Sequence, residues 1–195
     1  MTFKSPEIEE KLRRGFRHLN RFMVLGFRLG LGRFQQPWPR ITGSILVLVH
    51  TGRKTGRRHQ TGLNFAPVDG DLLVLAGFGP TSDWYRNVIA DPKVEVWLPD
   101  GWWDATAEDV SDHPDRLALL RKVLVASGFA AYVFGITPAI SDERLRQISE
   151  KYRLVRIRPG EPRTGPGGPN DLAWVWPVAA FALLPRALRS PRRRG

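Results

Sequence analysis

The sequence predicts a mainly β protein with helices, an α+β domain built on an antiparallel sheet or small barrel of about six strands. Short apolar runs follow one another along the chain, with turn residues between them. Two of these turns, Asp69-Gly70 and Asp100-Gly101, are dipeptides typical of tight hairpins. The expected helices do not alternate regularly with the strands, which disfavours a parallel doubly wound sheet.

The individual elements follow from local patterns. An amphipathic helix is predicted over residues 7–34, with Ser5-Pro6-Glu7 at its start and arginines along one face. Strands are predicted at Ile45–Thr51, His59–Pro67, Leu72–Ala76, Val94–Leu98, Trp102–Val110 and Tyr152–Ile157. Further helices are predicted at Trp84–Ala90 behind a Ser82-Asp83 cap, at His113–Ser127, and at Ser141–Lys151 with Ser141 as its cap.

Positive charge gathers at the two ends of the chain. The 30 Lys and Arg residues against 19 Asp and Glu residues give a net charge of +11. Residues 1–40, the helical arm, carry nine basic and three acidic side chains, and residues 160–195 carry six and two. The nearly neutral middle, residues 41–159, is the expected domain. Its neutrality argues against a nucleic-acid partner. The basic arms favour an anionic membrane surface, with solvated arms as the alternative.

The C-terminal arm, residues 160–195, combines a linker with an apolar and basic tail. Eight of the eleven residues Pro159–Pro169 are proline or glycine, which predicts the end of the domain. The apolar run Leu172–Leu184 follows, with Trp174 and Trp176 in it and arginines after it. This run is shorter than the ~18 residues of a membrane span. It is either an interfacial anchor or a tail packed on its own domain or on a second subunit.

The chain lacks cysteine. This excludes a disulfide scaffold, a thiolate metal site and a cysteine nucleophile. The four histidines have no metal-ligand spacing, so no metal is expected. The N-terminus begins polar and acidic, unlike a signal peptide, so we expect a cytoplasmic protein, with a peripheral position at the inner membrane face as a further expectation.

The most informative segment runs from His50 to Thr61. It holds four cations in the six positions from Arg53 to Arg58, between two glycines and two predicted strands. Glycine turns expose N–H groups that bind anions, and arginine adds bidentate hydrogen bonds to phosphate or carboxylate. The pattern predicts a pocket for a small polyanionic ligand, with a solvated basic turn as the alternative. It is not a Walker A loop, because arginine and not lysine follows Gly56.

A second segment places a glycine turn ahead of a helix. Gly77-Phe78-Gly79 precedes the helix that Ser82 and Asp83 begin. Such a turn can receive a flat ring or an anion. The Trp-Tyr pair in the helix is equally typical of a core.

Together the two segments resemble the deazaflavin-dependent nitroreductase family. Thr51–Leu98 carries a T-G-R-x-[ST]-G turn, a hairpin, a glycine turn and a W-Y-x-N helix in the family's order. The resemblance implies a split β-barrel of the FMN-binding kind. It implies coenzyme F-420, a 5-deazaflavin with a phosphate and an oligoglutamate tail. It also implies an oxidoreductase that transfers a hydride from the reduced coenzyme to a small-molecule electron acceptor: a nitro compound, a quinone or an activated alkene.

The resemblance further implies roles for particular residues. Arg53, Lys54 and Thr55 would hold the phosphate, with Arg57, Arg58 and His59 near the anionic tail. Thr61 and Asn64 would face the ring, and Gly77, Phe78 and Gly79 would line its plane. Trp84 and Tyr85 would anchor the helix behind the site, and Asn87 would brace it. Tyr132 or Ser82 would donate a hydrogen bond to the acceptor's developing anion, and otherwise solvent supplies the proton.

Alternatives remain at this point. FMN is the competing cofactor, although four cations in six positions exceed what one phosphate requires. A non-catalytic carrier of F-420, a flavin or a tetrapyrrole, and a membrane-surface binding protein, are the competing functions. A homodimer is compatible with the sequence. The N-terminal helix and the Phe129–Phe134 segment are expected to form a lid over the acceptor.

Overall fold

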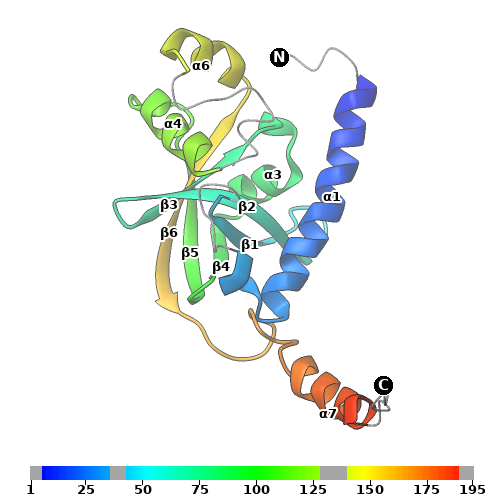
Figure 1. Ribbon diagram of the computed structural model, residues 1–195. Coiled ribbons are helices and arrows are strands. Elements are labelled where there is room, and N and C mark those ends of the chain that lie inside the picture. The colour runs from blue at the N-terminus through cyan, green and yellow to red at the C-terminus, as the bar shows by residue number, and fades with distance from the viewer. Residues whose placement is uncertain (1–5, 36–42, 128–139, 189–195) are drawn as a thin grey trace.

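The computed structural model describes residues 6–35, 43–127 and 140–188 of the chain (Figure 1). Its centre is a closed barrel of antiparallel strands in the order β1-β2-β3-β6-β5-β4, in which β4 also pairs with β1. The strands are β1 (Ile45–Thr51), β2 (Arg58–Val68), β3 (Asp71–Ala76), β4 (Lys93–Leu98), β5 (Gly101–Asp109) and β6 (Arg153–Pro162). The α-helices are α1 (Pro6–Arg28), α3 (Asp83–Ala90), α4 (Arg116–Ala126), α6 (Asp142–Ser149) and α7 (Val175–Leu188), and the short 3-10 helices are η1 (Gly32–Gln35) and η2 (Gly79–Thr81). The predicted fold class, a mainly β antiparallel barrel with helices, is confirmed.

β1 is apolar from Ile45 to Val49 because both of its faces are covered. Leu46 and Leu48 belong to the core inside the barrel. Val47 and Val49 pack outward against Phe27 of α1 and other large apolar side chains. A run buried on two faces shows no alternation in the sequence, and this explains the uninterrupted apolar stretch. The turn that leaves β1 is therefore mounted on one of the most fully buried strands in the molecule.

Local turn and capping signals act as predicted. Asp69 and Gly70 have φ of 53° and 88°, the positive pair that a tight hairpin between β2 and β3 requires. The hydroxyl of Ser141 accepts a hydrogen bond from the backbone N–H of Arg144 and caps α6. α4 begins at Arg116, later than the predicted His113. The reason is that His113 precedes Pro114, which disfavours helical backbone at that residue.

α1 ends at Arg28, not near residue 34 as the amphipathic pattern predicts. Gly30 adopts a φ of 79° and donates to the carbonyl of Phe27, while the N–H of Leu31 reaches back to the carbonyl of Gly26. This is a Schellman arrangement, which closes a helix with glycine in the left-handed region. The chain then makes only the short turn η1 before the described part stops.

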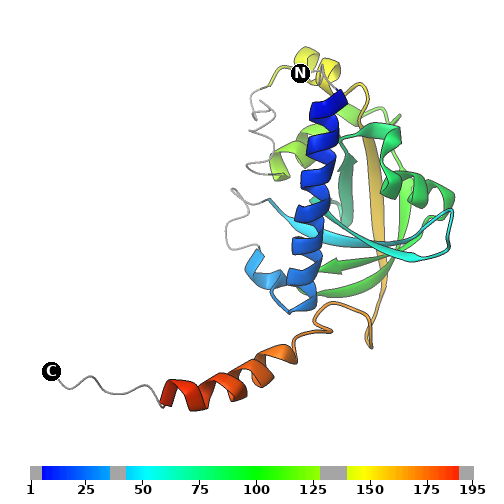
Figure 2. The same ribbon diagram turned by 90° about the vertical axis from the view of Figure 1, so that its right-hand side faces the viewer.

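Only part of the apolar surface of α1 is covered by the barrel. Phe27 is buried and Val24 packs beside it on the outer face of β1 and β4. Phe16, Leu19 and Phe22, farther toward the N-terminus, are exposed. Figures 1 and 2 show α1 running along the outside of the barrel.

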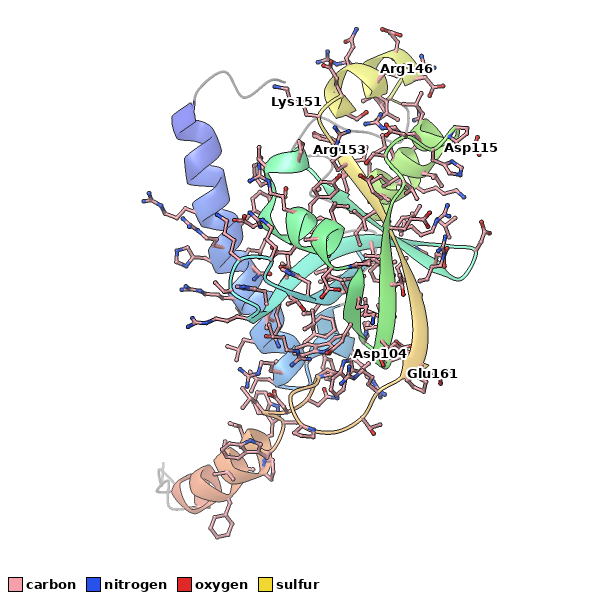
Figure 3. The ribbon with its side chains drawn as sticks, turned by 180° about the vertical axis from the view of Figure 1, so that it is seen from behind. Asp104, Asp115, Arg146, Lys151, Arg153 and Glu161 are labelled. Carbon is pink, nitrogen blue, oxygen red and sulfur yellow. The ribbon has the colours of Figure 1, made fainter. Side chains whose placement is uncertain are left out.

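β6 is longer than predicted and includes the start of the expected linker. Pro159 and Pro162 lie in the strand opposite Ala105 and Trp103 of β5, and the register shifts between these pairs. Figure 3 shows β6 running from Arg153 at one end of the barrel to Glu161 at the other, where Asp104 of β5 lies beside it. Proline is tolerated in such a place where its missing N–H is not needed for the ladder.

The segment after β6 folds back onto α1 and then leaves the body. The backbone N–H groups of Asn170 and Leu172 donate to the carbonyls of Phe27 and Arg28. Beyond this attachment α7 projects away from the barrel (Figure 2). In the part of the chain that the structure describes, no helix has both the length and the apolar character needed to cross a membrane.

Candidate functional site

The turn between β1 and β2 is held in shape by its two glycines. The N–H of Gly52 donates to the carbonyl of Arg57, and the N–H groups of Thr55 and Gly56 both donate to the carbonyl of Gly52. Gly56 has a φ of 65°, which favours glycine. A Cβ on Gly52 would lie 2.7 Å from Nε2 of His59, so this glycine lets the imidazole come close. The predicted basic turn is thus a closed and ordered loop.

Arg53 ties the turn to α3. Its Nη1 and its backbone N–H donate to Oδ1 of Asn87 over 2.9 Å and 3.2 Å. Its Nη2 forms an ion pair with Asp83 at 3.1 Å. The guanidinium is therefore fixed in position, and a neighbouring carboxylate compensates part of its charge.

Asn87 links Arg53 to the buried imidazole of His50. Because both groups of Arg53 donate, Oδ1 of Asn87 must face them, which turns Nδ2 toward Nδ1 of His50 at 3.2 Å. An amide NH₂ only donates, so Nδ1 accepts and Nε2 carries the proton toward Oγ1 of Thr61, 3.1 Å away. Burial, and then the charge of nearby His59, lower the pKa of His50 to about 4. His50 is consequently neutral near pH 7 and acts as a spacer between β1 and α3.

The remaining cations of the turn divide into bound and free groups. Arg58 pairs with Glu95, donates to the carbonyl of Gly167 at 2.9 Å and lies over the ring of Trp102. Lys54 and Arg57 have exposed side chains, and neither side chain has a hydrogen-bond or ion-pair partner among the described residues. Of the four cations expected to face one ligand, Arg53 and Arg58 are therefore already engaged by other residues of the protein.

Thr61 and Asn64 of β2, which were both predicted to face the ring of the cofactor, point to opposite faces of the strand. Thr61 points toward the inner face, where its hydroxyl meets His50. Asn64 points to the other face, where its Nδ2 lies against Gly43. Residues three apart on a strand project to opposite faces, so one ring cannot face both. Of the two, Thr61 is the one beside the turn.

The glycine turn before α3 is open at one glycine and closed at the other. Gly77 is exposed, and nothing lies within 4 Å of a Cβ built on it. Gly79 is buried with a φ of 60°, and a Cβ there would lie 2.1 Å from the carbonyl oxygen of Lys151. Phe78, between them, makes an edge contact with Phe16 of α1 at 5.8 Å. Gly79 thus serves close packing against Lys151, and only Gly77 and Phe78 present a surface to a ligand.

Behind this turn, α3 is fastened to the barrel. Trp84 packs against the core inside the barrel and Tyr85 is part of it. The hydroxyl of Tyr85 donates to Asp109. Burial, and then this bond, raise the pKa of Tyr85 to about 12, and the hydrogen bonds from Ser111 and Tyr85 lower the pKa of Asp109 although burial opposes this. These contacts agree with an anchoring part for Trp84 and Tyr85.

Ser82 and Tyr132 were predicted to donate a hydrogen bond to the electron acceptor, and only Ser82 lies within the described residues. Ser82 lies immediately before α3, is 6% exposed, and its Oγ has no hydrogen-bond partner among the described residues. Its hydroxyl does not cap the helix as predicted, although the helix begins where expected. Tyr132 and the Phe129–Phe134 segment lie outside the described residues.

α1 covers β2 beside the site through a contact that the sequence reading missed. Asn20 accepts from the N–H of Gly62 at 2.6 Å and donates to the carbonyl of Gln60 at 3.1 Å. Its side chain thereby satisfies β2 where that strand does not pair with β3. A Cβ on Gly62 would lie 2.7 Å from Cε of Met23, so only a glycine leaves room for this side chain of α1. A glycine inside a predicted strand is the signal for such a close approach.

A cavity lies elsewhere on the described part of the chain. It has a volume of about 750 Å³ and is lined by α4 and the far end of β2, including Ala66, Pro67 and Arg121. Ala66 is nine residues along the strand from Arg57, so the cavity and the basic turn are separated by up to about 30 Å. The exposed cations favour the turn as the site for an anionic ligand, although the volume of this cavity alone would favour the cavity.

Several solved structures are similar to part of this chain. Among solved structures, a conserved hypothetical protein from Mycobacterium tuberculosis is 25% identical, with a TM-score of 0.46, over 63% of this chain and 76% of that one. A protein described as an F420-H2 dependent reductase is 22% identical, with a TM-score of 0.44, over 58% of this chain and 92% of that one.

The family comparison is more specific. Residues 21–140 match the family model described as F420H(2)-dependent quinone reductase. The match spans the C-terminal third of α1, the basic turn, α3 and five of the six strands. It confirms the predicted resemblance to deazaflavin-dependent reductases and coenzyme F-420 as the cofactor. The chain belongs to the F420H(2)-dependent quinone reductase family.

Proposed function

We propose that this protein reduces a quinone, with reduced coenzyme F-420 bound along the turn between β1 and β2. Family membership supports the class of reaction and the cofactor. The observation that carries the placement is a pair of cations, Lys54 and Arg57, whose side chains are exposed and have no partner among the described residues, on a closed loop beside the start of α3. A quinone takes precedence over a nitro compound or an activated alkene because the family is described by that acceptor.

The residues of the turn fit an anionic cofactor in charge and in geometry. Lys54 and Arg57 supply two uncompensated positive charges, and Thr55 contributes an exposed hydroxyl between them. Arg53 is already oriented by Asn87 and Asp83, so it loses little side-chain entropy when an anion arrives. His59 stacks on His50 at 5.7 Å and borders the same loop. We assign the phosphate and the carboxylates of the tail to this group of residues.

When bound, the reduced coenzyme supplies a hydride to the acceptor. The chain itself contributes position and exclusion of water. Gly77 and Phe78 give a flat surface next to α3, and the contact of Phe78 with Phe16 brings α1 over that surface. Asn20 and Met23 hold α1 on β2, so this helix shields the inner end of the site from solvent.

The described residues include two candidates for moving a proton, and they differ in suitability. His50 is a poor general acid, because its pKa near 4 leaves it neutral and its Nε2 proton is engaged by Thr61. The hydroxyl of Ser82 has no partner among the described residues, but it is buried, so it donates to the oxygen that gains charge only if binding of the acceptor uncovers it. Tyr132 stays the second predicted donor. If neither acts, water supplies the proton.

The test is a steady-state assay with the reduced coenzyme and menadione under anaerobic conditions. Arg57→Ala is expected to raise KM for the coenzyme about tenfold or more with a smaller change in kcat, because one charge-assisted contact to the anion is lost. Arg144→Ala, which removes another exposed arginine on α6, is the matched control and leaves both constants unchanged. Unaltered KM in Arg57→Ala refutes the placement. Coenzyme binding without quinone turnover refutes the reaction and supports a carrier.

A further inference from the structure

α7 lies outside the residues that match the family and has no place in the proposed reaction. The match ends at residue 140, whereas α7 covers Val175–Leu188. Its base is nevertheless held firmly. Arg28 at the end of α1 makes two hydrogen bonds of 2.9 Å to the two carboxylate oxygens of Asp171, and the indole N–H of Trp176 donates to the carbonyl of Leu29 at 2.7 Å. The direction in which α7 leaves the body is therefore set by α1.

Beyond that base, α7 presents apolar side chains to solvent. Phe181 is 84% exposed, Trp174 immediately before the helix is 60% exposed, and Val178 is 57% exposed. Figure 2 shows the helix extending away from the barrel. Exposed apolar surface on this scale marks an interaction site. A 14-residue helix is also too short to be stable alone in water, so it needs a surface to lie on.

Length and charge identify that surface. Fourteen residues span about 21 Å as a helix, less than the ~30 Å of a hydrocarbon core, so α7 fits a position along a membrane and not across it. No acidic residue follows Asp171 in the sequence, whereas the stretch from residue 186 to the end contains five arginines. A cluster of this sign beside tryptophan and phenylalanine is typical of helices that lie in the interface of anionic bilayers.

We infer that α7 anchors the protein to the surface of an anionic lipid bilayer. The apolar side chains enter the boundary between headgroups and acyl chains, and the arginines bind lipid phosphates. The inference is independent of the proposed acceptor, because it concerns the location of the enzyme and not its turnover. It also answers the question left open by the sequence: the start of the tail packs on its own domain, and the helix after it is the membrane contact.

The experiment is co-sedimentation of the full chain with vesicles of phosphatidylcholine, with or without phosphatidylglycerol. We expect binding at least tenfold stronger to the vesicles that contain phosphatidylglycerol, and weaker binding at high salt, since each arginine near an anionic surface contributes about a fivefold factor. Val178→Asp is expected to reduce binding at least tenfold. Val125→Asp is the matched control, because Val125 on α4 is 53% exposed but lies on another part of the molecule, and it leaves binding unchanged.

Two further measurements keep the outcome decisive. Coenzyme titration of each variant shows that the barrel is folded, and it is independent of lipid. Sedimentation velocity without lipid tests whether a second copy of the chain covers α7 instead. Equal binding to both vesicle types, binding that Val178→Asp leaves intact, or a dimer that Val178→Asp dissociates would each overturn the inference.

Discussion

Replacing Asn87 with alanine removes the amide that joins the basic turn to α3. The variant loses two hydrogen bonds to Arg53, of 3.2 Å and 2.9 Å, and one of 3.2 Å to His50. Asn87 is buried, so water does not replace these bonds. At about 1 kcal/mol for each bond, the free energy of unfolding is expected to fall by about 3 kcal/mol. For a chain of this size such a loss lowers Tm by roughly 6–12 °C.

The assay pairs urea unfolding, followed by tryptophan fluorescence, with titration of the coenzyme. Asp83→Ala is the matched control, because Asp83 is the other partner of Arg53 but its side chain is 83% exposed, and its loss is expected to change stability far less. Coenzyme affinity is expected to fall about tenfold in Asn87→Ala, since Arg53 is no longer oriented before binding. An Asn87→Ala variant as stable as Asp83→Ala would refute the bridging part that we assign to the amide.

Three further predictions, tested with four variants, concern the surroundings of the site. The pKa of His50 is about 4 in the folded chain and near 6.5 in the unfolded chain, so the unfolded chain takes up a proton first as the pH decreases. The free energy of unfolding therefore falls by up to about 3 kcal/mol between pH 6.5 and pH 4. Urea unfolding across this range should show a shallower pH dependence in His50→Asn. Gly79→Ala meets the Lys151 carbonyl and a positive φ, so it should cost about 2–4 kcal/mol in thermal or urea unfolding, whereas Gly77→Ala, with open space around it, should leave stability unchanged and act on coenzyme affinity alone. The pKa of Tyr85 is about 12 in the folded chain and about 10 in the unfolded chain. Its contribution to stability is therefore complete below pH 10 and disappears between pH 10 and 12. An alkaline absorbance titration of Tyr85→Phe should lack one late-ionising phenol.

Most of the barrel could be predicted because its signals are local. The hairpin at Asp69-Gly70 and the cap at Ser141 each depend on residues within one turn. The length of β6 could not be predicted in this way. Pro159 and Pro162 are typical of a linker, and only the partner strand β5 with its register shift makes room for them. α1 was predicted too long because the apolar spacing continues past Gly30, where the backbone turns.

The site likewise has features that the local sequence predicts and features that depend on residues far away in the chain. The glycines and cations of the turn identify an anion-binding loop from twelve consecutive residues. Which cations remain available depends on partners far away in the sequence: Arg53 meets Asn87 34 residues later, and Arg58 meets Glu95 37 residues later. The two faces of β2 are a different case, because strand geometry alone separates Thr61 from Asn64 and the sequence contained that information.

The attachment of the C-terminal segment to the end of α1 has a consequence for biosynthesis. The bond between Arg28 and Asp171 joins residues 143 positions apart, and α1, which is made before the barrel, receives partners for its last carbonyls from a segment made after the barrel. α1 can pack Phe27 on β1 and β4 as soon as the barrel forms, but the carbonyl of Arg28 meets the N–H of Leu172 only after that later segment has left the ribosome. Closing so long a loop is slow, because its entropic cost must be met before the contacts between its two ends stabilise the protein. A chain truncated before residue 170 would keep the glycine closure of α1 but lose the pair between Arg28 and Asp171 and the hydrogen bonds from Asn170 and Leu172.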